Sequence, residues 1–408
     1  MSNSPHSGRP IRVLHVIDTL GPGGAEHQLV TLLPHLQRQG IECEVAILQG
    51  SYALVPIVER YGMPVYKMDH RDGRNFLSTS YRISVLLRER EYDIVHAHLW
   101  NSTMAVGFSK LRSRNPKRFV TFHNSAYQQF PAKSLTRRMR KLFDRLLLRY
   151  SFDRCIGVTQ FIASSNQELL GIPNVETIFN GVELSNLPAA TEQEKRATRE
   201  QLGCGRGDAL IVTAGRLNEQ KGHTVLIDAI ASLPQQGAQI KTVIFGEGAL
   251  REKLQKKISS LGLESKISMP GSVDHATLFQ AIAAADLFVF PSIHEPFGLA
   301  AAEAMALGTP VIASAVDGLP EFIEDGVSGK LVQAGDAQEV AKVIAQLLVD
   351  PSLRQQLGSA GLKRVKESLD IAVLSGKLVS LYRAALGIGV SSDESNPSVR
   401  SLGSGQAM

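Results

Sequence analysis

Short apolar segments alternate along the chain with longer segments in which apolar residues recur every three or four positions. This alternation predicts parallel β-strands separated by helices. It therefore predicts an α/β protein of two doubly wound, Rossmann-like domains whose parallel sheets face a central cleft, where ligands bind at the carboxyl ends of strands. The expected strands are 12–17, 43–48, 94–98, 118–123, 154–158 and 175–178 in the first series, and 209–214, 240–245, 267–269, 287–290, 310–313 and 330–332 in the second.

A polar segment, residues 180–207, separates the two series of strands and is the expected linker, with a helix at 191–202. A chain of 408 residues is also too long for one ordinary core. We expect an N-terminal domain over 1–185 and a C-terminal domain over 186–375. Residues 389–408 are rich in Ser and Gly, which predicts a disordered tail.

Composition indicates a cytoplasmic protein. Hydrophobic residues make up 43% of the chain, yet no apolar run approaches the roughly 20 residues that a membrane span requires. The polar N-terminal segment does not resemble a signal peptide, and the three cysteines are too widely spaced to suggest a disulfide framework. We expect a cytoplasmic location, and peripheral contact with the inner face of a membrane is a further hypothesis that the charge pattern raises.

The net charge of +5 is distributed unevenly. Residues 1–190 hold 23 Lys/Arg against 15 Asp/Glu, a net +8, and the remainder holds 21 against 24, a net −3. Much of the excess lies in 133–149, where apolar residues recur with helical spacing and basic residues fall between them. The apolar positions are Leu135, Met139, Leu142, Phe143, Leu146 and Leu147, and the basic ones are Arg137, Arg138, Lys141, Arg145 and Arg149.

This basic amphipathic segment has two interpretations. One is a helix that lies on anionic lipid headgroups or receives an anionic acceptor. The other is a helix that packs on the core and keeps a solvated basic face. Nucleic acid is not an expected partner, because aromatic residues are not interleaved with the charges.

The segment 291–310 combines an anion site with two carboxylates. The strand 287–290 ends there, and a helix then begins at Gly298. Free N–H groups and the positive end of the helix dipole suit a phosphate. Glu295 in the loop and Glu303 in the helix would repel a phosphate, so we expect them to accept hydrogen bonds from sugar hydroxyls. A phosphate and a polyol together indicate a nucleotide-sugar.

Two further loops follow the first strand of each series. In 215–222, Arg216 and Lys221 suit a diphosphate leaving group, whose growing negative charge they would stabilise. In 21–26, Gly23 and Gly24 allow backbone N–H groups to approach a pyrophosphate or a sugar. This second loop matches the dinucleotide fingerprint imperfectly, because Glu26 replaces its third glycine, and a tight structural turn is the other explanation.

Three histidines lie at strand ends. His96 and His98 point to one face of a strand, as a metal-binding pair would. No cysteine or carboxylate lies close in sequence to complete a site, so we predict no bound metal. His123 ends the strand 118–123, and we expect it to contact the sugar, with a purely structural histidine as the alternative.

Together these motifs resemble the retaining glycosyltransferases of family 4, the group 1 type. The resemblance covers roughly residues 10–385 and departs from the family at Thr159-Gln160, where a serine and an acidic residue are common. It rests on Gly23-Gly24-Ala25-Glu26, Asn180-Gly181-Val182-Glu183, Gly215-Arg216, Lys221-Gly222, Glu295-Pro296-Phe297-Gly298, Glu303 and Pro320-Glu321.

The resemblance implies the GT-B architecture, with a final helix over 376–388 that crosses back to the first domain, and neither cofactor nor metal. It implies a nucleotide-sugar donor, with Arg216 and Lys221 on the diphosphate, assisted by N–H groups of Phe297, Gly298 and Leu299. Glu303 would bind the ribose, Glu295 and His123 the transferred sugar, and Gly23 and Gly24 the donor phosphates.

The implied reaction moves a hexose to a glycan or lipid-linked acceptor, as in polysaccharide biosynthesis, by same-face displacement. The alternatives are a GT-B sugar-nucleotide epimerase and a non-catalytic nucleotide-sugar-binding protein at a membrane. A nicotinamide oxidoreductase is a more distant one. The sequence does not identify the nucleobase, the sugar or the acceptor.

Overall fold

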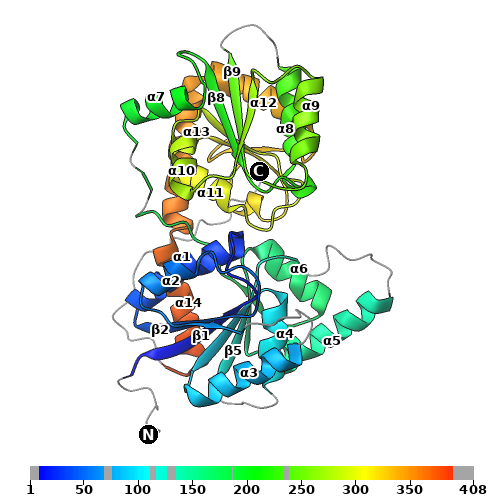
Figure 1. Cartoon of the computed structure of the whole chain (residues 1–408), viewed down its shortest axis with the longest axis vertical. Helices are drawn as coiled ribbons and strands as arrows, with labels where there is room; N and C mark the ends of the chain where they lie inside the picture. The colour runs from blue at the N-terminus through cyan, green and yellow to red at the C-terminus, as the bar shows by residue number, and fades with distance from the viewer. Residues whose placement is uncertain are drawn as a thin grey trace, which may run out of the picture.

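The chain forms two α/β domains, each built on one parallel sheet (Figure 1). The computed structural model describes residues 9–68, 76–110, 116–125, 135–185, 187–188, 190–233 and 239–388. The first sheet has the strand order β3-β2-β1-β4-β5-β6-β7, and the second has the order β10-β9-β8-β11-β12-β13. The predicted fold class is confirmed. The predicted tail at 389–408 lies outside the described residues.

The first domain contains all six predicted strands and one more. The additional strand β3 has three residues, none of them fully buried, so it lacks the apolar run by which strands are recognised. The elements are β1 (Ile11–Ile17), α1 (Gly24–Arg38), β2 (Ile41–Ile47), α2 (Val55–Arg60), β3 (Val65–Lys67), α3 (Phe76–Glu89), β4 (Ile94–His98), α4 (Trp100–Ser109), β5 (Lys117–Phe122), α5 (Leu135–Ser151), β6 (Arg154–Gly157), α6 (Gln160–Leu170) and β7 (Val175–Thr177).

The second domain contains the six strands expected of it, and the helix predicted in the linker is also present. That linker helix, α7, begins with a capping box in which Thr191 and Glu194 satisfy each other's backbone N–H groups. The elements are α7 (Glu192–Gln201), β8 (Ala209–Ala214), α8 (His223–Ser232), β9 (Ile240–Phe245), α9 (Arg251–Ser260), β10 (Ile267–Gly271), α10 (His275–Ala283), β11 (Leu287–Phe290), α11 (Leu299–Ala306), β12 (Val311–Ser314), β13 (Lys330–Val332), α12 (Ala337–Val349), α13 (Pro351–Ser368) and α14 (Ile371–Ala385).

Both sheets are buried on their two faces, which explains the continuous apolar runs. All six residues of β8 and all four of β11 are buried. Helices cover each sheet from both sides, so each domain has one apolar cluster above its sheet and another below. The loops at strand ends therefore stand on rigid supports.

The last helix, α14, packs against α1 of the first domain. It begins at Ile371, earlier than the range 376–388 assigned to it from sequence. The Asn180-Gly181-Val182 turn holds its start, because the Val182 N–H donates to Leu369 O (2.8 Å) and the Ile371 N–H donates to Val182 O (3.1 Å). The domain boundaries stay a prediction.

A second link between the domains lies at the start of α6. The Glu321 carboxylate accepts hydrogen bonds from the backbone N–H groups of Gln160 and Phe161, both at 2.6 Å. The Thr159 hydroxyl donates to Pro296 O (3.1 Å) and also caps α6. The Thr159-Gln160 position, where the sequence departs from the family pattern, is therefore a contact between the domains.

None of the helices in the described residues is both long and apolar enough to cross a membrane.

Alanine substitutions at Gly181 and Gly376, which both lie at or in α14 contacts, should change the free energy of unfolding in opposite directions. A Cβ at Gly181 would lie 2.6 Å from Ile371 Cα, whereas one at Gly376 would meet only Gln39 Oε1, at 3.6 Å. We expect Gly181→Ala to lower the free energy of unfolding by about 1–3 kcal/mol through overpacking. Gly376→Ala, inside α14, should raise it by about 0.5–1 kcal/mol. Urea unfolding curves measure both, and equal effects of the two variants would contradict this account of the turn.

Candidate functional site

Two loops of the second domain lie side by side because they follow neighbouring strands. The loop 215–222 follows β8, and the loop 291–298 follows β11. The Ile293 N–H donates to Gln220 O (2.7 Å), which ties the loops together. Gly222 has φ +63, and a Cβ there would lie 1.9 Å from Pro291 O, so this close approach requires glycine.

Lys221 and Glu295 form an ion pair between these loops. Lys221 Nζ lies 2.5 Å from Glu295 Oε2, and both side chains are largely buried, with 19% and 8% of their surface exposed. The Ser292 hydroxyl donates to the same oxygen (3.2 Å). Sequence analysis gave the two residues separate roles, on the diphosphate and on the sugar. In the structure Glu295 also holds the ammonium group of Lys221.

Arg216 is the exposed cation of the same region, and its side chain has no hydrogen-bond or ion-pair partner among the described residues. Burial raises the pKa of Glu26 in the first domain, and the Asp18 carboxylate raises it further, whereas the Arg216 cation lowers it. Arg216 and Glu26 therefore act on each other electrostatically across the two domains.

The glycine loop of the first domain reaches the start of α11. A Cβ at Gly24 would lie 3.8 Å from Leu299 Cδ1, so the two predicted donor-binding segments come together. A Cβ at Gly23 would lie only 2.1 Å from Glu26 Oε2, which shows that Glu26 folds back over this glycine. Phe297 is buried, and Gly298, with φ +96, is the N-cap of α11. The N–H groups of the first helical turn follow directly.

Glu303 lies in the second turn of α11 and is partly buried. Desolvation raises the pKa of its carboxyl from 4.5 to about 8. The carboxyl has no hydrogen-bond partner among the described residues. Glu303 is therefore predominantly protonated at neutral pH, and a neutral carboxyl can both donate and accept a hydrogen bond.

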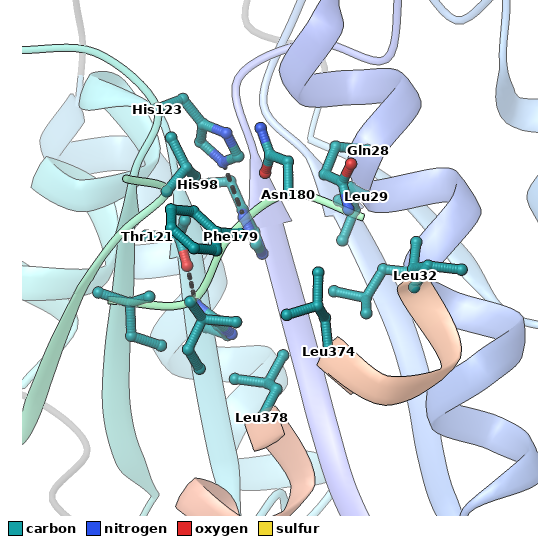
Figure 2. A pocket seen from close by; sticks show the side chains of 15 residues that line it. Gln28, Leu29, Leu32, His98, Thr121, His123, Phe179, Asn180, Leu374 and Leu378 are labelled. Carbon is teal, nitrogen blue, oxygen red and sulfur yellow. Dashed lines mark hydrogen bonds between the residues drawn. The ribbon is translucent and has the colours of Figure 1, made fainter. Parts of the chain in front are cut away.

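His123 follows β5 and lines a small cavity of about 40 Å³. Figure 2 shows His123, Asn180 and Gln28 at one end of this cavity, and Leu374 and Leu378 of α14 at the other. Gln28 and Asn180 are 8% and 7% exposed, and their side chains have no hydrogen-bond partner among the residues that the structure describes. His123 thus belongs to a mainly apolar cavity with an unsatisfied polar end.

Asp18 is a structural residue near the site that the sequence analysis missed. It follows β1 and caps the start of α4, because it accepts hydrogen bonds from Ser102 (backbone N–H, 2.7 Å) and from Asn101 (backbone N–H, 3.2 Å). The side chains of both residues donate to it as well. The cap supports Leu99, whose φ of 71 is strained for a residue other than glycine. An aspartate directly after a buried strand was the available signal.

The structure adds His15 to the histidine pair at 96 and 98. One ring nitrogen of each residue lies within 4.8 Å of the others, a spacing compatible with a metal ion. However, His96 Nδ1 lies 2.6 Å from the Tyr382 hydroxyl, and His96 Nε2 lies 2.8 Å from the Thr121 hydroxyl. A metal would displace one of these partners from His96. The absence of a metal stays a prediction.

Two family models match this chain in succession. Residues 22–186 match Glycosyltransferase Family 4, and residues 194–364 match Glycosyl transferases group 1. D-inositol 3-phosphate glycosyltransferase 1 of Catenulispora acidiphila is 30% identical over 391 residues, which are 89% of this chain and 91% of that protein. The phosphatidyl-myo-inositol mannosyltransferase of Mycobacterium leprae is 29% identical, over 74% of this chain and 76% of its own length.

Solved structures show the same architecture. Anabaena HepE, in complex with UDP-glucose, superposes with a TM-score of 0.80 at 22% identity and covers 92% of this chain and 100% of its own. Sucrose-phosphate synthase from Thermosynechococcus elongatus superposes with a TM-score of 0.78 at 22% identity, over 93% of this chain and 100% of its own. The fold, the two family models and the relatives together place this chain among the GT-B glycosyltransferases, with a family 4 domain followed by a group 1 domain.

Proposed function

We propose that this enzyme transfers a hexose, with retention, from a nucleotide diphosphate sugar to a glycan or lipid-linked acceptor. The observation that supports this most is the convergence of Arg216, Lys221 and the start of α11 beside Gly24 of the other domain. Two cations and a helix N-terminus form a site for a dianionic diphosphate. A nucleotide-sugar is also the ligand of HepE, which has the same fold.

The reaction places the acceptor hydroxyl on the face of the sugar from which the diphosphate departs. The bond between the anomeric carbon and the phosphate oxygen breaks, the bond to the acceptor oxygen forms, and the acceptor proton passes to the departing diphosphate. Arg216, Lys221 and the N–H groups at Gly298 and Leu299 stabilise the negative charge that grows on this leaving group. Neither Glu295 nor Glu303 acts as a nucleophile, in contrast to the two-carboxylate glycosidases.

The remaining polar residues orient the donor. Glu295 holds Lys221 in place and accepts hydrogen bonds from the transferred sugar with its other oxygen. Glu303, neutral before binding, exchanges hydrogen bonds with the ribose hydroxyls, and His123 contacts the sugar ring. Gly23 and Gly24 bring backbone close to the donor phosphates. The chemistry requires no cofactor or metal, because the protein supplies the compensating charge.

Helix α5 favours a lipid-linked acceptor at a membrane surface in the cytoplasm. Part of the apolar stripe of this helix faces outward, whereas Leu147 packs beside Gly107 and Phe143 stacks on Phe108 of α4, so each of the two interpretations holds for one side of the helix. Helix α5 lies at the edge of the first domain (Figure 1). The exposed apolar residues are Met139, Leu142, Phe143, Leu146 and Tyr150, and the exposed basic residues beside them are Arg138, Lys141, Arg145 and Arg149; the side chain of Arg137 lies outside the described residues.

An apolar stripe flanked by cations matches the interface of an anionic bilayer. The apolar side chains enter the acyl boundary, while the basic residues bind headgroup phosphates. We propose that α5 holds the enzyme on the inner face of the membrane, where a lipid-linked acceptor would be presented.

The first test of the function is donor binding. A thermal-shift panel of UDP-, GDP- and ADP-sugars should raise the melting temperature for one nucleobase, since a ligand of the native state stabilises it by mass action. Glu303→Ala should mainly reduce this shift, whereas Lys221→Met should lower kcat about 100-fold. Lys253→Met, which removes an exposed ion pair with Glu219 close to the same loop, is the matched control.

Three results would contradict the transferase. Turnover and donor binding close to wild type in both Lys221→Met and Glu303→Ala would remove the assigned site. Conversion of the nucleotide-sugar without any acceptor would instead identify an epimerase, and donor binding without any product would identify a binding protein.

The raised pKa of Glu303 predicts that the stability of the folded protein depends on pH. Its folded pKa of about 8 exceeds the ordinary value of 4.5, so between these values the folded chain holds a proton that the unfolded chain has lost. The free energy of unfolding should therefore fall as the pH rises from 5 to 8. Relative to Glu303→Gln, we expect wild type to lose about 1 kcal/mol or more across this range. Parallel stability curves for the two proteins would show that the carboxyl is not protonated.

The membrane contact can be tested with vesicles. Wild type should sediment with phosphatidylcholine vesicles that contain phosphatidylglycerol, and replacing Arg138, Lys141 and Arg145 by Gln should weaken binding about tenfold. Replacing Lys256 and Lys342 of the second domain by Gln changes the net charge without touching α5, and should have little effect. Unchanged sedimentation of the α5 variant would remove the proposal.

A further inference from the structure

Three buried histidines form a hydrogen-bonded line that begins at His123. His123 Nε2 lies 3.4 Å from His98 Nδ1, and His98 Nε2 lies 3.1 Å from His15 Nδ1. The three residues come from successive neighbours in the sheet, since β1 pairs with β4 and β4 pairs with β5. We call these residues the histidine chain.

Both ends of the histidine chain are open. His123 Nδ1 and His15 Nε2 are buried and have no hydrogen-bond partner among the described residues. Each of the two contacts inside the chain requires one hydrogen, and each neutral imidazole carries one hydrogen. Two of the three ring hydrogens therefore lie in the two contacts, and the third lies at one end of the histidine chain. Either His123 Nδ1 or His15 Nε2 carries the third hydrogen, and the other end is bare.

The histidine chain remains neutral at physiological pH. Burial lowers the pKa of His15 to about 3 and that of His123 to about 4, and it also lowers the pKa of His98. A positive charge here would be desolvated, because no carboxylate is in contact with the three rings in the part of the chain that the structure describes. The three imidazoles of the histidine chain can thus change tautomers, but they do not take up an additional proton.

The open end at His123 meets the polar end of the cavity. Figure 2 shows the His123 ring near Asn180, with Gln28 beyond Asn180 and the His98 contact on the Nε2 nitrogen of His123. Asn180 and Gln28 have amide groups without protein partners, which can donate and accept hydrogen bonds. His123 therefore lines the polar end of the cavity, while its unpartnered nitrogen Nδ1 is itself buried.

We infer that His98 and His15 are positioning residues that decide which ring nitrogen of His123 carries its hydrogen. When His123 Nδ1 carries it, the imidazole donates to a ligand oxygen, and His15 Nε2 is bare. When the three hydrogens each move to the other nitrogen, His123 Nδ1 becomes an acceptor for a hydroxyl. The value of this control for the transferred sugar rests on the proposed function, whereas the coupling itself does not.

His96 is a side branch and not part of this line. Its ring stacks on His98 at 4.4 Å between centroids, but both its nitrogens are occupied by Tyr382 and Thr121. Removing the Thr121 hydroxyl changes a neighbour of the histidine chain without interrupting it. Thr121→Val is therefore a matched control.

Nitrogen NMR of the full chain labelled with ¹⁵N-histidine measures the tautomers directly. In the otherwise wild-type chain, His15→Phe should change the ratio of the two His123 tautomers at least about twofold, because it removes the hydrogen-bond partner of His98 Nε2. In the background of His98→Leu, which interrupts the chain, His15→Phe should leave the His123 ratio unchanged.

Rescue and controls separate this coupling from a general loss of structure. His98→Gln should preserve the effect of His15→Phe, because an amide offers one donor and one acceptor to the two neighbours. Thr121→Val should leave the His123 ratio as in wild type. The resonances of His27 and His275 report whether each variant is folded.

One result overturns the inference. If His15→Phe does not alter His123, or alters it equally in the His98→Leu background, His98 and His15 do not control its tautomer. The NMR samples contain no nucleotide-sugar and no acceptor substrate. This outcome is therefore independent of whether nucleotide-sugar binding or transfer is found.

Discussion

The organisation of this enzyme depends on one constraint, namely that parallel strands direct all their carboxyl ends to the same edge of a sheet. Neighbouring strands therefore deliver the loops of Lys221 and Glu295 to the same place, although the two residues are far apart in sequence. The same rule brings His98 and His123 together at the ends of β4 and β5. The two sheets supply rigid supports, and the chemistry is carried by short loops on them.

Desolvation gives these loops their particular chemistry. Desolvation raises the pKa of the Glu303 carboxyl to about 8, and burial lowers the pKa of His98. Lys221 and Glu295 form a largely buried ion pair, in which each partner compensates the burial of the other. The site thus contains one exposed cation, Arg216, and one that is already held in position, Lys221.

The two domains are joined by contacts that also shape the site. Glu321 of the second domain caps α6 of the first, and the turn at Val182 anchors the beginning of α14. Tyr382 of α14 then reaches His96, next to the histidine chain. The connection that returns the polypeptide to its first domain thus contributes both to the cavity wall and to the surroundings of His123.

The sequence alone determined the class of fold and most of the candidate residues. Apolar runs of buried strands are visible without a structure, and the Glu295 to Glu303 motif is local enough to be read from its spacing. Strand β3 was not predicted from the sequence because it is short and half-exposed. On α5, the periodicity was correct but could not show whether the apolar stripe faces the core or the solvent.

Only the tertiary structure decided the partners. The Lys221–Glu295 pair, the Glu321 cap and the His15–His98 contact join residues separated by 74, 161 and 83 positions. No local pattern specifies such contacts, because they arise from the order of strands in a sheet and from the packing of one domain on another. The sequence therefore determined which groups are present, and the packing determined their charge, their hydrogen-bond partners and the surface that they share.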